Sequence, residues 1–239
     1  MKCVRRGFEP KDAYEFGVKS YHKLNQAAAD LFFLLNRGYD IKSASTFIGN
    51  HYLLSERQRM ALARMISPEE MLHKREERKI SLEHPPSYVE IDGFNLIVTL
   101  EVALSQALLL EGMDGTYRDL AGLRGTYRIV DKTIQAVSLL LTCLDRLCIT
   151  SAVLYLDQPV SNSGRLRSLL LEMARDYAVA LEVQLQPDVD RCLAGLEGVV
   201  TTDAIILNGC KSWLNLGRYI IDTEISDAWV FRLNHSGSA

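Results

Sequence analysis

Aspartates follow several short apolar runs in the second part of the chain. They appear directly after these runs, or a few residues later, in the order Asp92, Asp157, the pair Asp188 and Asp190, and Asp203. If the runs are neighbouring parallel strands, their carboxyl ends meet at one edge and the carboxylates converge. Converging carboxylates repel one another and are costly to desolvate unless a cation compensates them. Hard oxygen ligands of this kind suit Mg²⁺ or Mn²⁺, which hold a phosphate and activate a water for in-line attack.

A structural interpretation competes with this one, because aspartate is also a common turn residue and helix N-cap. A single aspartate after a strand favours that interpretation. The whole set, each member following an apolar run, favours a shared functional site.

Two further segments contain candidate phosphate ligands. Asn95 could donate to a phosphate oxygen, orient a neighbouring carboxylate, or merely hold its own turn. The loop after Asp157 opens a helix with hydroxyl groups, an amide and an arginine, a combination that can bind phosphate. Its candidate ligands are Ser161, Asn162, Ser163 and Arg165. The alternative is that one of the serines only caps the helix.

The segment 114–128 contains Gly-Thr-Tyr-Arg twice, at Gly115 and at Gly125. We expect a loop that overhangs the crevice. Its arginines, Arg118 and Arg124 among them, could contact a nucleic-acid backbone while the tyrosines stack on a base. The alternative is a surface loop with solvated arginines.

The pattern around these residues predicts an α/β domain. Strands are expected at 88–91, 153–156, 181–185 and 199–201, with a possible fifth at 219–221, and helices at 96–110, 129–146 and 164–177. Strands that alternate with helices imply crossover connections and a mainly parallel sheet with helices on both faces.

The first third of the chain is expected to be a small all-α domain. Helices are predicted over 11–36 and 41–48, and two capping boxes, Ser55 with Gln58 and Ser67 with Glu70, predict two more. Pro68 would stand at the first helical position. Pro85-Pro86 interrupts both helix and sheet, so the domains are expected at 1–86 and 87–239. Apolar residues are dense over 27–35, which favours packing against the second domain or, equally, a homodimer.

Two segments resemble motifs of the PIN-like nuclease superfamily, in its NYN branch. Ile91-Asp92-Gly93-Phe94-Asn95 is similar to the first-strand signature, a strand ending in Asp-Gly-aromatic-Asn. The segment 199–206 resembles a later strand, where Ser/Thr-x-Asp opens a helix. Asp190 stands where the family often places an acid at the start of the intervening helix. The resemblance covers about residues 88–222.

The resemblance implies a Rossmannoid PIN/NYN-like fold and a ribonuclease, or a related RNA-processing protein, that depends on Mg²⁺ or Mn²⁺. It implies that Asp92, Asp190 and Asp203 hold the metal, with Asp157 as a further ligand or a nearby carboxylate. A PIN-like site usually has an additional acid on a helix. Here Glu101, Asp119 and Asp188 are all candidates for it.

The charge, the cysteines and the lengths of the apolar runs argue against a strongly basic nucleic-acid binder, a zinc site and a membrane protein. The 239 residues have a formal net charge of -3, so any contact with nucleic acid must come from a local basic patch. The five cysteines lack C-x-x-C spacing, which favours reduced thiols over a zinc site. Their odd number and the lack of a signal peptide favour a reducing cytoplasm. No apolar run approaches the roughly 20 residues that a membrane span needs, so we expect no membrane partner.

The leading hypothesis is therefore a metal-dependent ribonuclease whose partner is RNA. Its main alternative is a catalytically weak or inactive module of the same fold that binds RNA or a nucleotide. A third hypothesis is a small-molecule phosphohydrolase or phosphotransferase that uses the loop 161–165. The last is a structural scaffold, in which the carboxylates would be dispersed.

Overall fold

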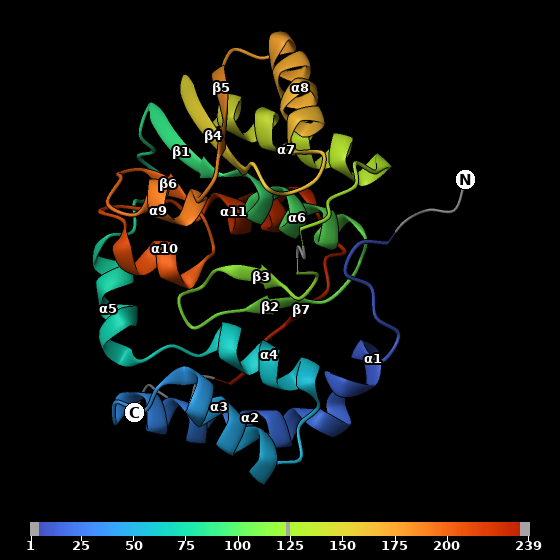
Figure 1. Cartoon of the computed structure of the whole chain (residues 1–239), viewed down its shortest axis with the longest axis vertical. Helices are drawn as coiled ribbons and strands as arrows, with labels where there is room; N and C mark the ends of the chain where they lie inside the picture. Colours follow the sequence, from blue (N-terminus) through green and yellow to red (C-terminus); the bar gives the residue numbers. More distant parts are fainter. Residues whose placement is uncertain (1–4, 123–124, 235–239) are drawn as a thin grey trace.

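The computed structural model describes residues 5–122 and 125–234, which contain two β-sheets and a group of N-terminal helices (Figure 1). The main sheet has four parallel strands in the order β5-β4-β1-β6. These strands are β1 (Tyr88–Asp92), β4 (Ser151–Asp157), β5 (Ala180–Gln186) and β6 (Val199–Val200). The four strands expected with most support are confirmed, and so is their parallel direction.

Helices cover both faces of the main sheet, as expected for buried parallel strands. They are α6 (Gly93–Leu104), α7 (Asp131–Arg146), α8 (Ser163–Met173), α9 (Val189–Leu193), α10 (Ala204–Gly209) and α11 (Leu216–Glu224), with a 3₁₀ turn η1 (Ala174–Asp176) after α8. Ile91 and Leu154, which lie opposite each other in β1 and β4, belong to the larger core with α6, α7, α8 and α11. Val153 and Tyr155 point to the other face and pack with α9, α10 and Trp213.

A second sheet differs from the expectation. The helix expected over 96–110 begins at Gly93 and ends at Leu104, and the chain then enters β2 (Leu109–Glu111). This strand pairs antiparallel with β3 (Tyr117–Asp119) and parallel with β7 (Val230–Phe231). The segment expected to be one loop over 114–128 therefore includes a strand. Strands of two or three residues are too short to show a period in the sequence.

The strand considered possible over 219–221 is wrong. These residues belong to α11, in which Leu216, Ile220 and Ile221 are buried. Leu216 and Ile220 are four residues apart, as are the buried Gly217 and Ile221, so these positions share one helical face. The local run Tyr-Ile-Ile favours a strand. The segment is nevertheless helical, because a helix buries its apolar face against the larger core.

The N-terminal helical region agrees with the expectation in outline. Its helices are α1 (Asp12–Glu15), α2 (Val18–Asn36), α3 (Ile41–His51), α4 (Glu56–Met65) and α5 (Glu69–Glu77). The single helix expected over 11–36 is broken at Gly17, whose backbone is extended and caps α2. The capping box of Ser55 and Gln58 is confirmed. The box of Ser67 and Glu70 is wrong, because Pro68 takes the N-cap position and no side chain caps α5.

The second sheet lies between the main sheet and helices α1–α4 in the view of Figure 1. Leu24 and Leu31 of α2 share a buried cluster with Leu110 of β2 and Phe231 of β7. The buried face of α2 thus packs on the second sheet, whereas Phe33, in the same apolar segment, is 56% exposed. In the ranges that the structure describes, no helix is both long enough and apolar enough to cross a membrane.

Candidate metal and phosphate site

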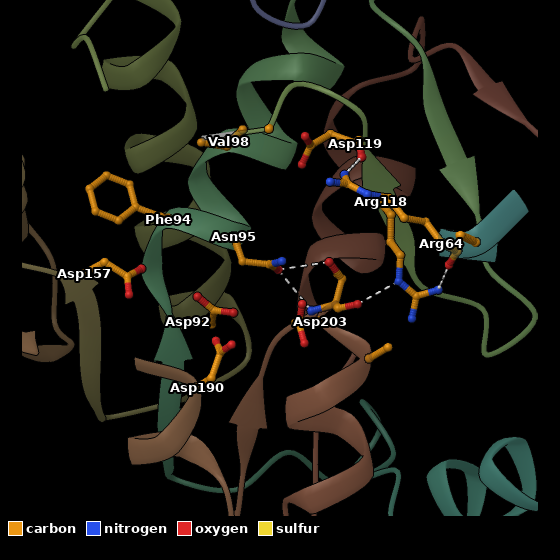
Figure 2. A pocket seen from close by; sticks show the side chains of 14 residues that line it. Arg64, Asp92, Phe94, Asn95, Val98, Arg118, Asp119, Asp157, Asp190 and Asp203 are labelled. Carbon is orange, nitrogen blue, oxygen red and sulfur yellow. Dashed lines mark hydrogen bonds between the residues drawn. The ribbon is translucent and has the colours of Figure 1, made fainter. Parts of the chain in front are cut away.

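A pocket of about 310 Å³ lies at the carboxyl edge of the main sheet, where β1 and β4 end (Figure 2). All four aspartates proposed as site residues line it: Asp92, Asp157, Asp190 and Asp203. Asn95 and Arg118 also line it. In the view of Figure 2, Asp92, Asp190 and Asp203 lie side by side, Arg118 reaches the turn before Asp203, and Arg64 extends toward Asp119. The scaffold hypothesis predicts dispersed carboxylates, but the structure brings these aspartates together in one pocket.

The first aspartate is positioned by a junction between strand and helix that is packed too closely for a side chain at Gly93. Asp92 is the last residue of β1 and α6 starts at Gly93, with no loop between them. A Cβ on Gly93 would lie 2.3 Å from Leu154 Cδ2 and 2.7 Å from the carbonyl oxygen of Tyr155. Real Cβ atoms do not approach backbone that closely, so Gly93 serves the close packing of α6 on β4.

The other three aspartates come from separate elements. Asp157 ends β4, the direct neighbour of β1. Asp203 follows β6 and caps α10, because Oδ1 accepts from the N–H groups of Ile205 (2.7 Å) and Ile206 (3.4 Å). Asp190 lies in the first turn of α9, which leaves β5 and packs over β1 and β4. The N-cap interpretation thus holds for Asp203, and it does not exclude a site, since its second carboxylate oxygen makes no hydrogen bond within the described residues.

Asp92 has the most perturbed electrostatic environment of the four. Its side chain is 6% exposed. Burial, together with the charges of Asp203, Asp190 and Asp157, raises the pKa of Asp92 to about 7, although the hydrogen bond from Thr201 Oγ1 (2.8 Å) lowers it. The four carboxylates therefore share one electrostatic environment.

The pKa values of Asp157 and Asp190 are also raised. Burial is the largest cause that raises the pKa of Asp157, and the charge of Asp188 adds to it. Burial also raises the pKa of Asp190, with further contributions from the charges of Asp203 and Asp157. Within the described ranges, no ion pair involves any of the four pocket aspartates. The nearest compensation within these ranges is indirect, since the charge of Asp203 acts on the buried Arg75 without a direct contact.

The donor chemistry of the pocket fits a hard divalent cation, but its geometry is not a complete cage. Across residues 5–122 and 125–234, no three His, Cys, Asp or Glu side chains are arranged to hold a metal ion. Mg²⁺ is usually held by only one or two carboxylates, together with waters and phosphate oxygens of the substrate. An acidic pocket without a three-ligand group is compatible with such a site.

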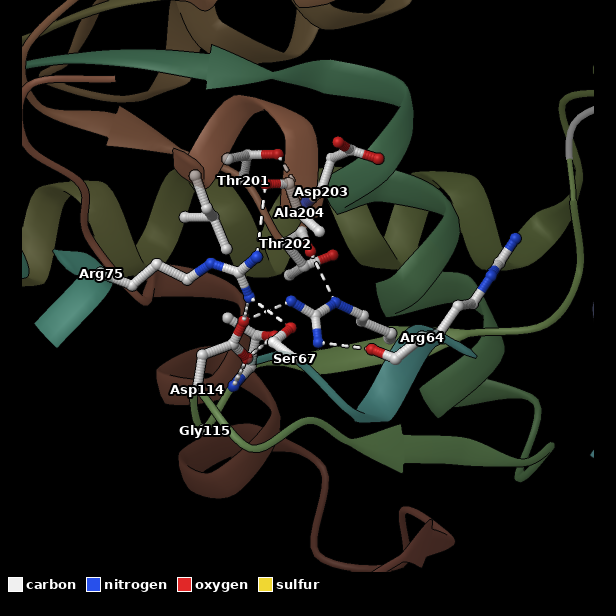
Figure 3. Close-up of polar contacts among 12 residues, drawn as sticks. Arg64, Ser67, Arg75, Asp114, Gly115, Thr201, Thr202, Asp203 and Ala204 are labelled. Atoms are coloured by element: carbon white, nitrogen blue, oxygen red, sulfur yellow. Dashed lines mark hydrogen bonds and ion pairs between the residues drawn. The ribbon is translucent and has the colours of Figure 1, made fainter. Parts of the chain in front are cut away.

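A buried ion-pair network lies beside Asp203, because the carbonyl oxygens of its neighbours Thr202 and Ala204 accept from arginines of the network (Figure 3). Arg75 Nη1 and Arg118 Nη2 both donate to Asp114 Oδ2, at 2.6 and 2.5 Å. Arg118 Nε donates to the carbonyl oxygen of Thr202 and Arg118 Nη1 to that of Arg64, each at 2.7 Å. Every nitrogen of the Arg118 guanidinium is thus committed to the protein. The expectation that Arg118 grips nucleic acid from a surface loop is wrong, because it is a buried residue of β3.

The tyrosines of the repeated Gly-Thr-Tyr-Arg segment are also buried. Tyr117 and Tyr127 are 1% and 0% exposed, so neither ring is free to stack on a base. Arg124 lies outside the described residues.

Asn95 links two elements of the pocket. Its Oδ1 accepts from the Thr202 backbone N–H (3.0 Å) and from Thr202 Oγ1 (2.9 Å). Asn95 therefore holds the turn that leads to Asp203 rather than its own turn. Its Nδ2 has no acceptor in the part of the chain that the structure describes, which leaves the amide free to donate into the pocket.

The loop 161–165 lies outside the pocket lining. Asn162 Nδ2 donates to the carbonyl oxygen of Tyr127 (2.7 Å), and Ser161 Oγ accepts from the Tyr127 N–H (3.2 Å). Ser163 is buried, and its Oγ donates to the carbonyl oxygen of Gln158 (3.4 Å). Arg165 is exposed. The structure uses the first three to hold neighbouring backbone and brings none of the four to the aspartates.

The three candidates for an additional acid have different surroundings. Glu101 is fully buried and pairs with Arg6, Tyr127 and Thr133 away from the pocket. Asp119 lines the pocket, but its two oxygens accept from Thr99 Oγ1 and from the N–H of Ala121. Asp188 caps α9 by accepting from the N–H of Arg191 (3.1 Å). Of the three, only Asp119 lines the pocket together with the four aspartates.

Two residues of the site had not been predicted. Thr201 donates to Asp92, and the Ser/Thr-x-Asp pattern contained it without indicating this contact. Arg64 comes from α4, on the far side of Pro85-Pro86. No local signal separates it from other arginines on helix surfaces.

The chain matches two families whose descriptions state no function. Residues 85–219 match "Domain of unknown function (DUF5616)", and residues 23–78 match "Protein of unknown function (DUF434)". An uncharacterized protein of Methanocaldococcus jannaschii is 33% identical over 186 residues, which cover 77% of this chain and 88% of that protein. No solved structure matches the chain. Because the first match spans more than half of the sequence, the chain belongs to the family described as "Domain of unknown function (DUF5616)".

Proposed function

We propose that the protein is a ribonuclease, or a related RNA-processing phosphodiester hydrolase, that depends on Mg²⁺ or Mn²⁺. The observation that carries this proposal is the gathering of Asp92, Asp157, Asp190 and Asp203 in one pocket without a direct ion pair among the described residues. The resemblance of 91–95 and 199–206 to PIN/NYN motifs supports it. The parallel sheet with acids at its carboxyl edge supports a PIN/NYN-like fold for the second part of the chain.

One or two of Asp92, Asp190 and Asp203 would hold the cation directly, and the remaining carboxylates, Asp157 among them, would add negative charge near it. When bound, the cation would polarise a phosphate oxygen and make water a better nucleophile at neutral pH. Asn95 would donate from Nδ2 to a phosphate oxygen while its Oδ1 keeps the turn to Asp203 in place. Thr201 would orient Asp92 through its hydroxyl donor.

Asp92 would couple cation binding to the release of a proton. Since the pKa of Asp92 is about 7, a substantial fraction of the free protein holds a proton on this carboxyl at neutral pH. A metal ligand must be deprotonated, so the cation and the proton compete. We therefore expect the affinity for Mn²⁺ to rise with pH through this range.

The decisive experiment compares cleavage of a labelled single-stranded RNA by the wild type, Asp203→Asn and Asp92→Asn in Mn²⁺. Asparagine keeps the shape and can still cap α10, so the fold should persist. We expect cleavage to fall by on the order of 100-fold or more in both variants. Asp176→Asn, on the exposed surface of η1, is the matched control and should cleave like the wild type. Equal cleavage by all four proteins would refute the proposal.

A non-hydrolytic RNA-binding module is the second candidate. The specific observation in its favour is that the described residues contain no preassembled group of three metal ligands. It predicts that the wild type binds RNA but does not cleave it in Mn²⁺ or Mg²⁺. Cleavage that depends on Asp203 excludes it.

A further inference from the structure

We infer that Arg64 of α4 binds a phosphate of the RNA, so that the N-terminal helical region completes the substrate site. This inference rests on the proposed function, since it names the phosphate-binding side chain of the same pocket. Arg64 lies within the residues that match the DUF434 family, and the four aspartates lie within those that match DUF5616. Both matched segments of the chain therefore contribute to one pocket.

The first step of the argument is that Arg64 is held in place at the pocket. The last carbonyl groups of a helix have no partner within the helix. At the end of α4, the carbonyl oxygen of Arg64 accepts from Arg118 Nη1 (2.7 Å), and that of Met65 accepts from the N–H of Met113 (2.9 Å). Both donors belong to the second sheet or its turn. The end of α4 is thus fixed relative to the main-sheet edge rather than merely close to it.

The second step concerns which cation remains available. The described lining of the pocket contains two arginines, Arg64 and Arg118. All the guanidinium nitrogens of Arg118 donate to Thr202, Arg64 and Asp114. The Arg64 side chain is half-buried, and its single acceptor in the described ranges is the carbonyl oxygen of Asp119, reached from Nη1. Its remaining N–H groups are free to meet a ligand.

The third step is the charge of the substrate. A pocket lined by five aspartates repels a polyanion, so a phosphodiester needs cationic contacts to enter it. One would come from the divalent ion on the side of Asp92. Arg64 also lines the pocket and extends toward Asp119 in Figure 2, where it would contact a second oxygen of the same phosphate or the next phosphate. A guanidinium suits this role because its planar N–H fork matches phosphate oxygens.

The test measures RNA affinity rather than cleavage. A short fluorescein-labelled single-stranded RNA is titrated with the full chain by fluorescence anisotropy, with Ca²⁺ in place of Mn²⁺. Loss of one charge-assisted hydrogen bond should weaken binding by Arg64→Gln roughly tenfold. The slope of log affinity against log salt should fall by about 0.7, the value for one phosphate contact on a single strand. Arg64→Lys keeps the charge and should retain intermediate affinity.

Arg175→Gln is the matched control, because Arg175 is exposed on η1, outside the pocket, and the variant makes the same change in net charge. It should bind RNA like the wild type. Thermal melts of each variant verify that the fold persists. Equal affinity of Arg64→Gln and the wild type would overturn the inference, as would an equal loss in Arg175→Gln.

The result also separates this inference from the proposed function. If Asp203→Asn abolishes cleavage and Arg64→Gln binds RNA normally, the nuclease proposal stands and the role of Arg64 is wrong. If the wild type never cleaves RNA but Arg64→Gln loses affinity for it, the role of Arg64 stands and hydrolysis is wrong.

Discussion

Asp92→Asn should make the free protein more stable at alkaline pH while it removes the proposed activity. Asp92 is buried among three other carboxylates, and the pKa of its carboxyl is raised from 3.8 to about 7. The folded protein therefore holds the proton more tightly than the unfolded chain does. Ionised Asp92 opposes folding, and asparagine cannot ionise. A group that destabilises the free protein but is needed for a bound cation is typical of a functional site.

The magnitude follows from the pKa difference. A difference of about 3 pKa units corresponds to about 4 kcal/mol, since one unit is 1.36 kcal/mol. This destabilisation is absent below about pH 4, grows as the pH rises toward 7, and is complete above it. The amide oxygen of the Asp92→Asn variant can still accept from Thr201, but burial of an unpaired amide N–H group costs about 1–3 kcal/mol. At about pH 8 we expect a net gain of roughly 1–3 kcal/mol.

Urea unfolding in EDTA at about pH 5 and about pH 8 measures this effect. The stability of the variant relative to the wild type should increase between the two pH values. Asp176→Asn should show no such change. Addition of Mn²⁺ at the higher pH should stabilise the wild type and leave Asp92→Asn nearly unaffected. A variant that is less stable than the wild type at both pH values, by an amount independent of pH, would refute the electrostatic reasoning.

Three further predictions concern the buried ion-pair network beside the pocket, the loop 161–165 and the binding of Mn²⁺. Arg75→Met should lower the free energy of unfolding by about 3–5 kcal/mol, because it removes one partner of the buried Asp114; a urea midpoint unchanged from the wild type would contradict this. Arg165→Gln should leave affinity for RNA and for nucleotides unchanged, since Arg165 is exposed outside the pocket; loss of nucleotide binding in a titration calorimeter would instead support the phosphohydrolase hypothesis. In the wild type, RNA and Mn²⁺ should each increase the affinity of the protein for the other, whereas RNA should not increase the weak Mn²⁺ affinity of the Asp203→Asn variant. Electron paramagnetic resonance of free Mn²⁺ measures these affinities. Binding of Mn²⁺ to the wild type that does not depend on RNA would contradict the prediction.

Much of the main sheet and its acidic edge could be predicted from the sequence. Strands β1, β4 and β5 are five to seven residues long, and each shows its apolar run directly. The capping box at Ser55 is equally local, because both of its hydrogen bonds join residues three apart. The parallel topology then brings the strand ends to one edge, so Asp92 and Asp157 had to be neighbours once their strands paired.

The sequence by itself thus determined the residues that end the strands and the chemistry that their carboxylates allow, because these depend on contacts between near neighbours. Tertiary structure alone decided what surrounds them. The second sheet forms from strands of two or three residues whose partners are distant in the chain. The roles of Arg118 and Arg64 depend on which carbonyl groups pack against each guanidinium. An arginine has the same local pattern whether it is buried in a network or open to a pocket, so only packing distinguishes the two.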